Sequence, residues 1–143
     1  MKKITYGTGS DESRDVDVGD MDGDSQLDIV VANIGDRNMI YYGSNKRSYI
    51  RSKAFGDPAA ATHSIMLADL DRDGNMDIVV GNKGQRNHYY LNNKKELMKY
   101  TFGQKDGDTY GVTIGNLDGD AYPDIVTANS GGWNIIYYNR PPK

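Results

Sequence analysis

The chain has 143 residues, with 17 lysines and arginines, 20 aspartates and glutamates, and a formal net charge of −3. This length fits a single domain, and the lack of cysteine excludes disulfides, thiol nucleophiles and cysteine metal sites. The composition is that of a folded globular protein, and no apolar run reaches the roughly 20 residues of a membrane helix, so membrane insertion is not expected.

Three copies of one pattern, each with four short predicted strands, organise the whole chain. The first strand ends at an aromatic-Gly pair and is expected at residues 2–6, 49–55 and 98–102. The second strand alternates, so that Val16 and Val18 share one face, and an acidic loop follows it. An apolar strand ending in Asn comes next, and a second Asn opens a strand rich in tyrosine. The resulting blade repeats span about 2–43, 49–92 and 98–139, and no helix is expected.

The acidic loops at residues 20–28, 69–77 and 116–124 hold 11 of the 20 acidic residues. Carboxylates placed this close repel one another, so a cation or a neighbouring positive charge must offset them. Two simpler explanations fit these loops less well. In an EF-hand the twelfth loop position would be Glu, but here it is Val31, Val80 or Thr127. The alternative of plain Asp-Gly turns does not account for three copies of the same carboxylate spacing.

The D-x-D-x-D-G-x-x-D loops, the aromatic-Gly pairs and the D-I-V-V-x-N strands resemble the FG-GAP/VCBS repeats of integrin α-chain propellers and several propeller lectins. The resemblance implies an all-β fold of three four-stranded β-propeller blades, with up to three Ca²⁺ ions per chain. It also implies that loop positions one, three, five and nine bind through side chains and that position seven binds through its carbonyl. The implied ligands are Asp20, Asp22, Asp24, Gln26 and Asp28 in loop one, Asp69, Asp71, Asp73, Asn75 and Asp77 in loop two, and Asn116, Asp118, Asp120, Tyr122 and Asp124 in loop three.

The three loops are not equivalent. Position six, where a left-handed backbone is often needed, is glycine only at Gly74, and is Ser25 or Ala121 in the other loops. Asn116 also removes one negative charge from loop three. We therefore expect calcium affinity to fall from loop two to loop one to loop three.

Three blades are too few to close a ring, because propellers have about four to eight. We expect a twofold homodimer with six blades, in which residues 2–6 of one chain complete the last blade of the other. A larger closed ring, or a piece of a longer secreted adhesin or enzyme, are the alternatives. The start Met1-Lys2-Lys3 is followed by Ile4-Thr5-Tyr6-Gly7, which is not a signal-peptide pattern, so an extracellular or periplasmic location rests on the resemblance alone.

The face opposite the acidic loops carries the residues that differ between repeats. Trp133, the single tryptophan, is a natural stacking platform for a sugar, although it could equally fill a blade junction or the dimer seam. The candidate ligand-binding residues are Arg14, His63 and Tyr110 at the strand starts, and Arg37, Arg86 and Trp133 in the turns.

These patterns favour a non-enzymatic calcium-binding module that acts as a binding or adhesion scaffold, with a carbohydrate-binding lectin as the alternative. The partner would be a carbohydrate or a protein. His63 and His88 are the only histidines, and no nucleophile or phosphate-binding motif accompanies them. The basic residues are scattered, so nucleic-acid binding is not expected.

Overall fold

The computed structural model describes residues 1–140, in which eleven strands form three antiparallel sheets. The all-β prediction is confirmed, and these residues include no helix that is long and apolar enough to cross a membrane. The first sheet contains β1 (Ser13–Gly19), β2 (Asp28–Asn33), β3 (Asn38–Tyr41) and β4 (Ser52–Phe55); the second contains β5 (Thr62–Ala68), β6 (Asp77–Asn82), β7 (Asn87–Asn92) and β8 (Leu97–Phe102); the third contains β9 (Thr109–Gly115), β10 (Asp124–Asn129) and β11 (Ile135–Tyr137).

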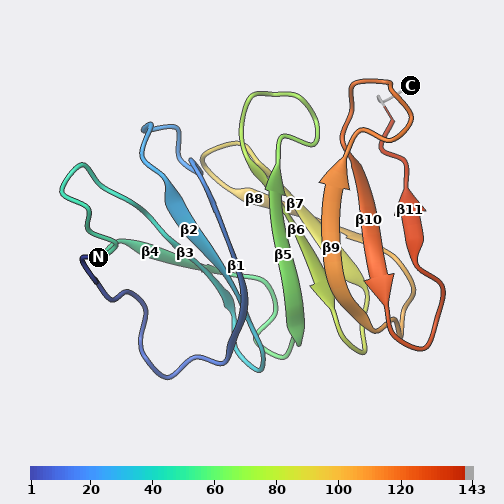
Figure 1. Ribbon diagram of the computed structural model, residues 1–143, viewed down its shortest axis with the longest axis horizontal. Coiled ribbons are helices and arrows are strands. Elements are labelled where there is room, and N and C mark those ends of the chain that lie inside the picture. The colour runs from blue at the N-terminus through green and yellow to red at the C-terminus, as the bar shows by residue number, and fades with distance from the viewer. Residues whose placement is uncertain (141–143) are drawn as a thin grey trace.

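The three sheets lie side by side, and neighbours in each sheet are neighbours in the sequence (Figure 1). The first strands of the sheets contact one another, with β5 between β1 and β9. In the first and second sheets, the strand that ends at the aromatic-Gly pair is paired with the tyrosine strand before it, so that β4 joins β3 and β8 joins β7.

The predicted strand at residues 2–6 is absent: residues 1–12 contain no strand, and the third sheet has three strands. A strand is stabilised by hydrogen bonds to a neighbouring strand, and residues 2–6 pair with none in the described chain. The segment instead lies over the outer face of the first sheet, where the rings of Tyr6 and Tyr41 are 5.4 Å apart.

Apolar side chains fill the two spaces between the sheets. The middle sheet contributes to both cores, because Ile78 and Val80 of β6 pack toward the first sheet while Val79 packs toward the third. A strand covered on both faces needs apolar residues at every position, which explains the unbroken run in the sequence.

The paired asparagines close the turn between the second and third strand of each sheet. In the first sheet, Asn38 Oδ1 accepts a hydrogen bond from the Asn33 backbone N–H at 2.9 Å, and Asn33 Nδ2 donates to the Arg37 carbonyl at 2.9 Å. The same two bonds recur in the second and third sheets. In each turn, Nδ2 of the first Asn donates to the carbonyl of the residue before the second Asn, which is Arg37, Arg86 or Trp133.

The second asparagine also ties its sheet to the next one. Asn38 Nδ2 donates to Thr62 Oγ1 at 3.2 Å, and Asn87 Nδ2 donates to Thr109 Oγ1 at 2.9 Å. Both asparagines and both threonines are buried, so each amide fixes the relative position of two sheets within the core.

Replacing Asn87 with Ala should lower the free energy of unfolding by about 2–3 kcal/mol, because the Asn82 N–H and the Thr109 hydroxyl lose a buried partner. Urea denaturation would measure the change. Asn45→Ala, the same substitution on an exposed loop, is the control and should have little effect. Equal stability of the two variants would contradict the role of the inter-sheet amide.

Candidate metal centre

All three acidic loops turn through left-handed backbone at position six. The φ angles there are 67° at Ser25, 85° at Gly74 and 77° at Ala121. Glycine adopts this region without strain, whereas serine and alanine do not. Position four is also left-handed in each loop, where loop two has Arg72 and the other loops have glycine, so each loop contains one non-glycine residue in this region and the backbone does not separate the three loops.

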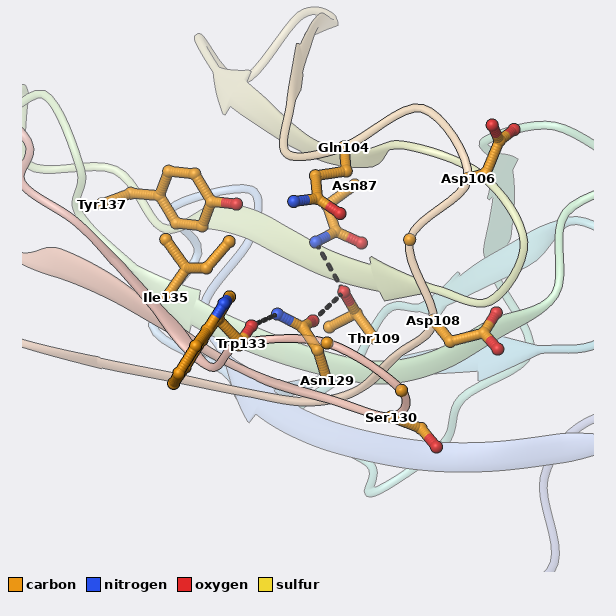
Figure 2. A pocket seen from close by; sticks show the side chains of 13 residues that line it. Asn87, Gln104, Asp106, Asp108, Thr109, Asn129, Ser130, Trp133, Ile135 and Tyr137 are labelled. Carbon is orange, nitrogen blue, oxygen red and sulfur yellow. Dashed lines mark hydrogen bonds between the residues drawn. The ribbon is translucent and has the colours of Figure 1, made fainter.

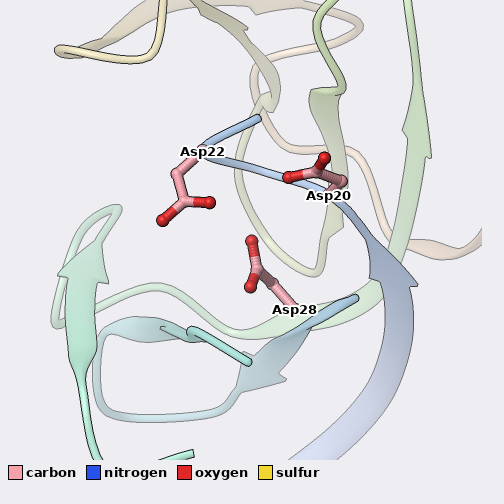
Figure 3. A group of neighbouring side chains, drawn as sticks. All are labelled: Asp20, Asp22 and Asp28. Atoms are coloured by element: carbon pink, nitrogen blue, oxygen red, sulfur yellow. The ribbon is translucent and has the colours of Figure 1, made fainter. Parts of the chain in front are cut away.

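Positions one, three and nine come together in loops one and two. Figure 3 shows Asp20, Asp22 and Asp28 turned toward one another, with one oxygen from each lying within 4.8 Å of the others. Asp69, Asp71 and Asp77 form the same group in loop two. Within residues 1–140, the loop-three carboxylates form no such three-residue group.

The aspartate at position nine is buried in each loop and holds the backbone in place. In loop two, Asp77 accepts hydrogen bonds from the Leu70 and Asn92 backbone N–H groups, both at 2.8 Å. Asp28 and Asp124 accept the equivalent pairs of bonds. Burial, together with the nearby negative charges of Asp71 and Asp73, raises the pKa of Asp77 to about 6, although the two backbone hydrogen bonds act to lower it.

Two buried carboxylate oxygens in these groups have no hydrogen-bond partner in the described chain. They are Oδ1 of Asp22 in loop one and Oδ1 of Asp69 in loop two. An unpaired buried carboxylate oxygen is costly, and a divalent cation between the three carboxylates would satisfy it. The residues of loops one and two therefore fit a hard cation with oxygen ligands.

Loop one has a positive side chain that the sequence interpretation missed. The Arg51 guanidinium pairs with Asp22 and lies over the Tyr42 ring, with 3.9 Å between Cζ and the ring centroid. Hydrogen bonding to Asp22 raises the pKa of Arg51. Its position, just before β4, separates it from the loop by almost 30 residues, so no local pattern could have revealed the contact.

The remaining predicted ligands lie outside the carboxylate groups. Oδ1 of Asp24, Asp73 and Asp120 each accepts a hydrogen bond from the backbone N–H two residues later, at Gln26, Asn75 and Tyr122. In loop three, Asn116 Oδ1 accepts from Gly119 N at 2.7 Å. Metal binding stays a prediction for all three loops, and within the described residues the carboxylate groups include neither positions five and seven nor any residue of loop three.

Trp133 lies on a turn beside a polar pocket of about 250 Å³ between the second and third sheets (Figure 2). Its side chain is 88% exposed. Asp106, Asp108 and Gln104, from the loop between β8 and β9, line the same pocket. The sequence did not single out these three residues, because the matching positions in the loop between β4 and β5 are Asp57, Ala59 and Ala61, so no shared pattern marks them.

The other five predicted ligand-binding residues do not line the Trp133 pocket. His63 and Tyr110 lie together, with ring centroids 4.7 Å apart. Burial lowers the pKa of His63, and the positive charge of Arg14 lowers it further. Arg37 and Arg86 are exposed on separate turns. The structure thus forms no single site from the six residues.

Two comparisons with known proteins bear on these loops. A sequence model of the FG-GAP-like repeat matches residues 20–80 and residues 69–127, each match starting at the first residue of an acidic loop. The search of curated proteins gave no match.

Replacing Asp77 with Ala should destabilise the chain even when no metal is added, by about 2–5 kcal/mol, because two buried backbone N–H groups lose their acceptor. The matched control is Asp71→Asn, which changes an exposed member of the same group and should alter the metal-free stability by about 0.5 kcal/mol or less. Urea denaturation in chelator compares them, and a stable Asp77→Ala chain would contradict the structural role of position nine.

Proposed function

The chain belongs to the FG-GAP-like repeat family, and on this basis we propose that it is a non-enzymatic, calcium-binding β-propeller module that serves as a binding or adhesion scaffold. The observation that carries the proposal is the pair of three-carboxylate groups, each with a buried oxygen that lacks a partner. No chemistry beyond cation binding is needed to account for these carboxylates.

Calcium suits these loops better than other common ions. It accepts roughly six to eight oxygen ligands in flexible geometry, whereas magnesium tends to keep several waters and zinc favours nitrogen and sulfur. Asp20, Asp22 and Asp28 would hold the ion in loop one, and Asp69, Asp71 and Asp77 in loop two. A bound ion would offset carboxylate repulsion and fix the hairpin between the first two strands of each sheet.

The loops would differ in affinity. Loop two combines three grouped carboxylates with glycine at position six. In loop one, Arg51 already neutralises part of the charge at Asp22, which would weaken cation binding there. Loop three has Asn116 in place of an aspartate, and we place it last.

Each sheet would act as one blade of a closed ring, and a second copy of the chain would complete it. The outer faces of the first and third sheets expose apolar residues, among them Val18, 54% exposed, and Tyr138, 50% exposed. Two copies would supply six blades, within the range of about four to eight found in propellers, whereas three copies would exceed it.

The second candidate function is carbohydrate binding at Trp133, and its exposed ring is the observation that favours it. The aligned turns carry Arg37 and Arg86, so the structure offers this ring once per chain instead of as a set of repeated sugar pockets. This difference supports the scaffold over the lectin.

Removing calcium with excess chelator should lower the melting temperature by several degrees or more, since an ion that binds only the folded chain stabilises it by mass action. Differential scanning calorimetry with and without added Ca²⁺ measures the shift. Asp71→Asn should reduce the calcium-dependent shift, and the exposed Asp106→Asn outside the loops should preserve it. Identical melting curves with calcium and with chelator would refute the calcium proposal.

Replacing Trp133 with Ala should leave calcium-dependent stability unchanged, because the ring is exposed and the turn is held by the hydrogen bond that Asn129 Nδ2 donates to the Trp133 carbonyl. If the lectin function holds, the same variant loses at least tenfold in affinity on a glycan array. Absence of glycan binding by the unsubstituted chain would remove the lectin and leave the scaffold.

A further inference from the structure

Residues at matching positions of the three sheets are buried between sheets but exposed at the free face of the third sheet. Met21 and Leu70, at position two of loops one and two, are 3% and 5% exposed, whereas the matching Leu117 is 50% exposed. Ile40 is 1% exposed in the first sheet, and the matching Ile136 is 44% exposed. The third sheet therefore presents the surface that the first and second sheets bury against the sheet that follows them.

The free face of the first sheet shows the complementary pattern. Ile65 and Val112, in β5 and β9, are 1% and 8% exposed because each faces the preceding sheet. The matching Val16 in β1 is 51% exposed. The free face of the third sheet thus has the residues that pack on a following sheet elsewhere in the chain. The free face of the first sheet has the residues that pack on a preceding sheet.

The N-terminal segment already occupies part of the seam that such packing would form. Phe55 at the end of the first sheet packs on Tyr90 of the second, with ring centroids 5.2 Å apart, and Phe102 packs on Tyr137 at 5.0 Å. Tyr6, the matching aromatic residue, packs on Tyr41 of the first sheet at 5.4 Å. Tyr6 therefore lies where the last strand of a preceding sheet would place it.

The glycine after each aromatic residue shows what is missing at this place. Gly56 and Gly103 have φ angles of 79° and 78°, and an added Cβ would meet both a tyrosine hydroxyl and an asparagine Nδ2 within 3.4 Å. Gly7 has the same left-handed φ of 83° and the same tyrosine neighbour, Tyr41, but no asparagine. The absent neighbour corresponds to Asn134 of a third sheet.

Asn134 and Ser13 have the orientation that this contact requires. Ser13 Oγ donates to Asn33 Oδ1 at 3.0 Å, as Thr62 Oγ1 donates to Asn82 Oδ1 at 2.9 Å, so its lone pairs can accept an amide N–H. Asn134 is exposed, and its Oδ1 accepts from Asn129 N at 2.9 Å like its buried counterparts. Its Nδ2 would then match the donors of Asn38 and Asn87.

A cavity beside β11 marks the place of the absent fourth strand. It has a volume of about 510 Å³ and is lined by Leu91, Phe102, Tyr137 and Tyr138, among others. Between the first two sheets, Leu97 at the start of β8 packs against the core. The third sheet has no fourth strand within residues 1–140 to supply a matching side chain.

We propose that the third sheet of one copy packs on the first sheet of a second copy, that residues 2–6 of the second copy add to β11 as its fourth strand, and that Asn134 donates to Ser13 across the seam. The occupant is a second copy because this chain contains both halves of the incomplete sheet, and because the seam continues the register of the two interfaces within the chain. This inference rests on the ring closure proposed above and assigns its contacts.

The seam is weaker than the interfaces inside the chain. Asn92 and Asn139 each donate to a loop carbonyl of the preceding sheet, at 2.8 Å and 2.7 Å, but their counterpart in the first sheet is Gly43. Ser64 Oγ accepts from Val112 N at 3.1 Å, and its counterpart in the third sheet is Gly111. Two polar contacts are therefore missing at the seam, and the ring should open there first.

Cysteine cross-linking tests the seam directly, because the chain has no cysteine of its own. The variant Ser13→Cys/Asn134→Cys should form a closed covalent dimer on mild oxidation, with no free thiol remaining. A mixture of the two single variants should form a dimer, whereas each single variant alone should stay uncross-linked. The matched control is Asn38→Cys/Thr62→Cys, the equivalent pair inside one chain, which should form an intramolecular disulfide.

Monomers with free thiols, under conditions in which the control pair oxidises, would overturn the proposal, and so would a ladder of longer covalent chains.

As a second measurement, analytical ultracentrifugation should show a dimer for the unsubstituted chain and a monomer for Ile136→Arg, with Asn45→Arg as a dimeric control. A monomeric unsubstituted chain at high concentration would also overturn it. Calcium titration of the same samples separates the outcomes, since a calcium-stabilised monomer refutes the seam alone and a dimer insensitive to calcium refutes the metal sites alone.

Discussion

Each sheet of this protein is apolar on both faces, and this constraint governs the rest of the structure. A sheet of this kind is stable only when another layer covers each face, and two of the three sheets have one face that no other sheet of the chain covers. The N-terminal segment covers part of one free face, where Tyr41 is buried although no sheet lies over it. The other free face keeps Ile136 and Leu117 in contact with solvent. This pattern of burial is the basis on which packing against a second copy was proposed above.

Buried polar groups give these otherwise uniform apolar layers a defined register. Apolar packing alone would tolerate small displacements of one sheet against another, whereas a buried amide without its partner is costly. The Asn38–Thr62 and Asn87–Thr109 bonds set the spacing at one end of the sheets. At the other end, the buried aspartates at position nine hold the acidic loops through backbone hydrogen bonds. The groups of three carboxylates are therefore built on backbone that the core has already fixed.

The sequence was sufficient to predict the strands and the loops because both repeat. Period-two alternation, Asn pairs and Asp-rich loops recur three times, so each copy supports the interpretation of the others. What it could not predict depends on contacts between distant residues. Arg51 pairs with Asp22 from the segment just before β4, and Asp106 and Asp108 line the Trp133 pocket from a loop whose residues differ between the repeats. Residues 2–6 form no strand within one chain for a related reason, since a strand needs a paired neighbour and the one expected for it belongs to a second copy.

Cation binding in the acidic loops and the packing of one sheet on the next are physically connected. The carboxylate groups lie at the hairpins between the first two strands of the first and second sheets, and position two of these loops, at Met21 or Leu70, packs in the core against the following sheet. A cation that fixes the loop therefore also fixes the side chain that packs on the next sheet. In loop three, this side chain is Leu117, at the proposed seam, and its loop has the fewest carboxylates. Metal binding at loop three would thus be coupled to ring closure, because closure would bury Leu117 and hold its loop in place.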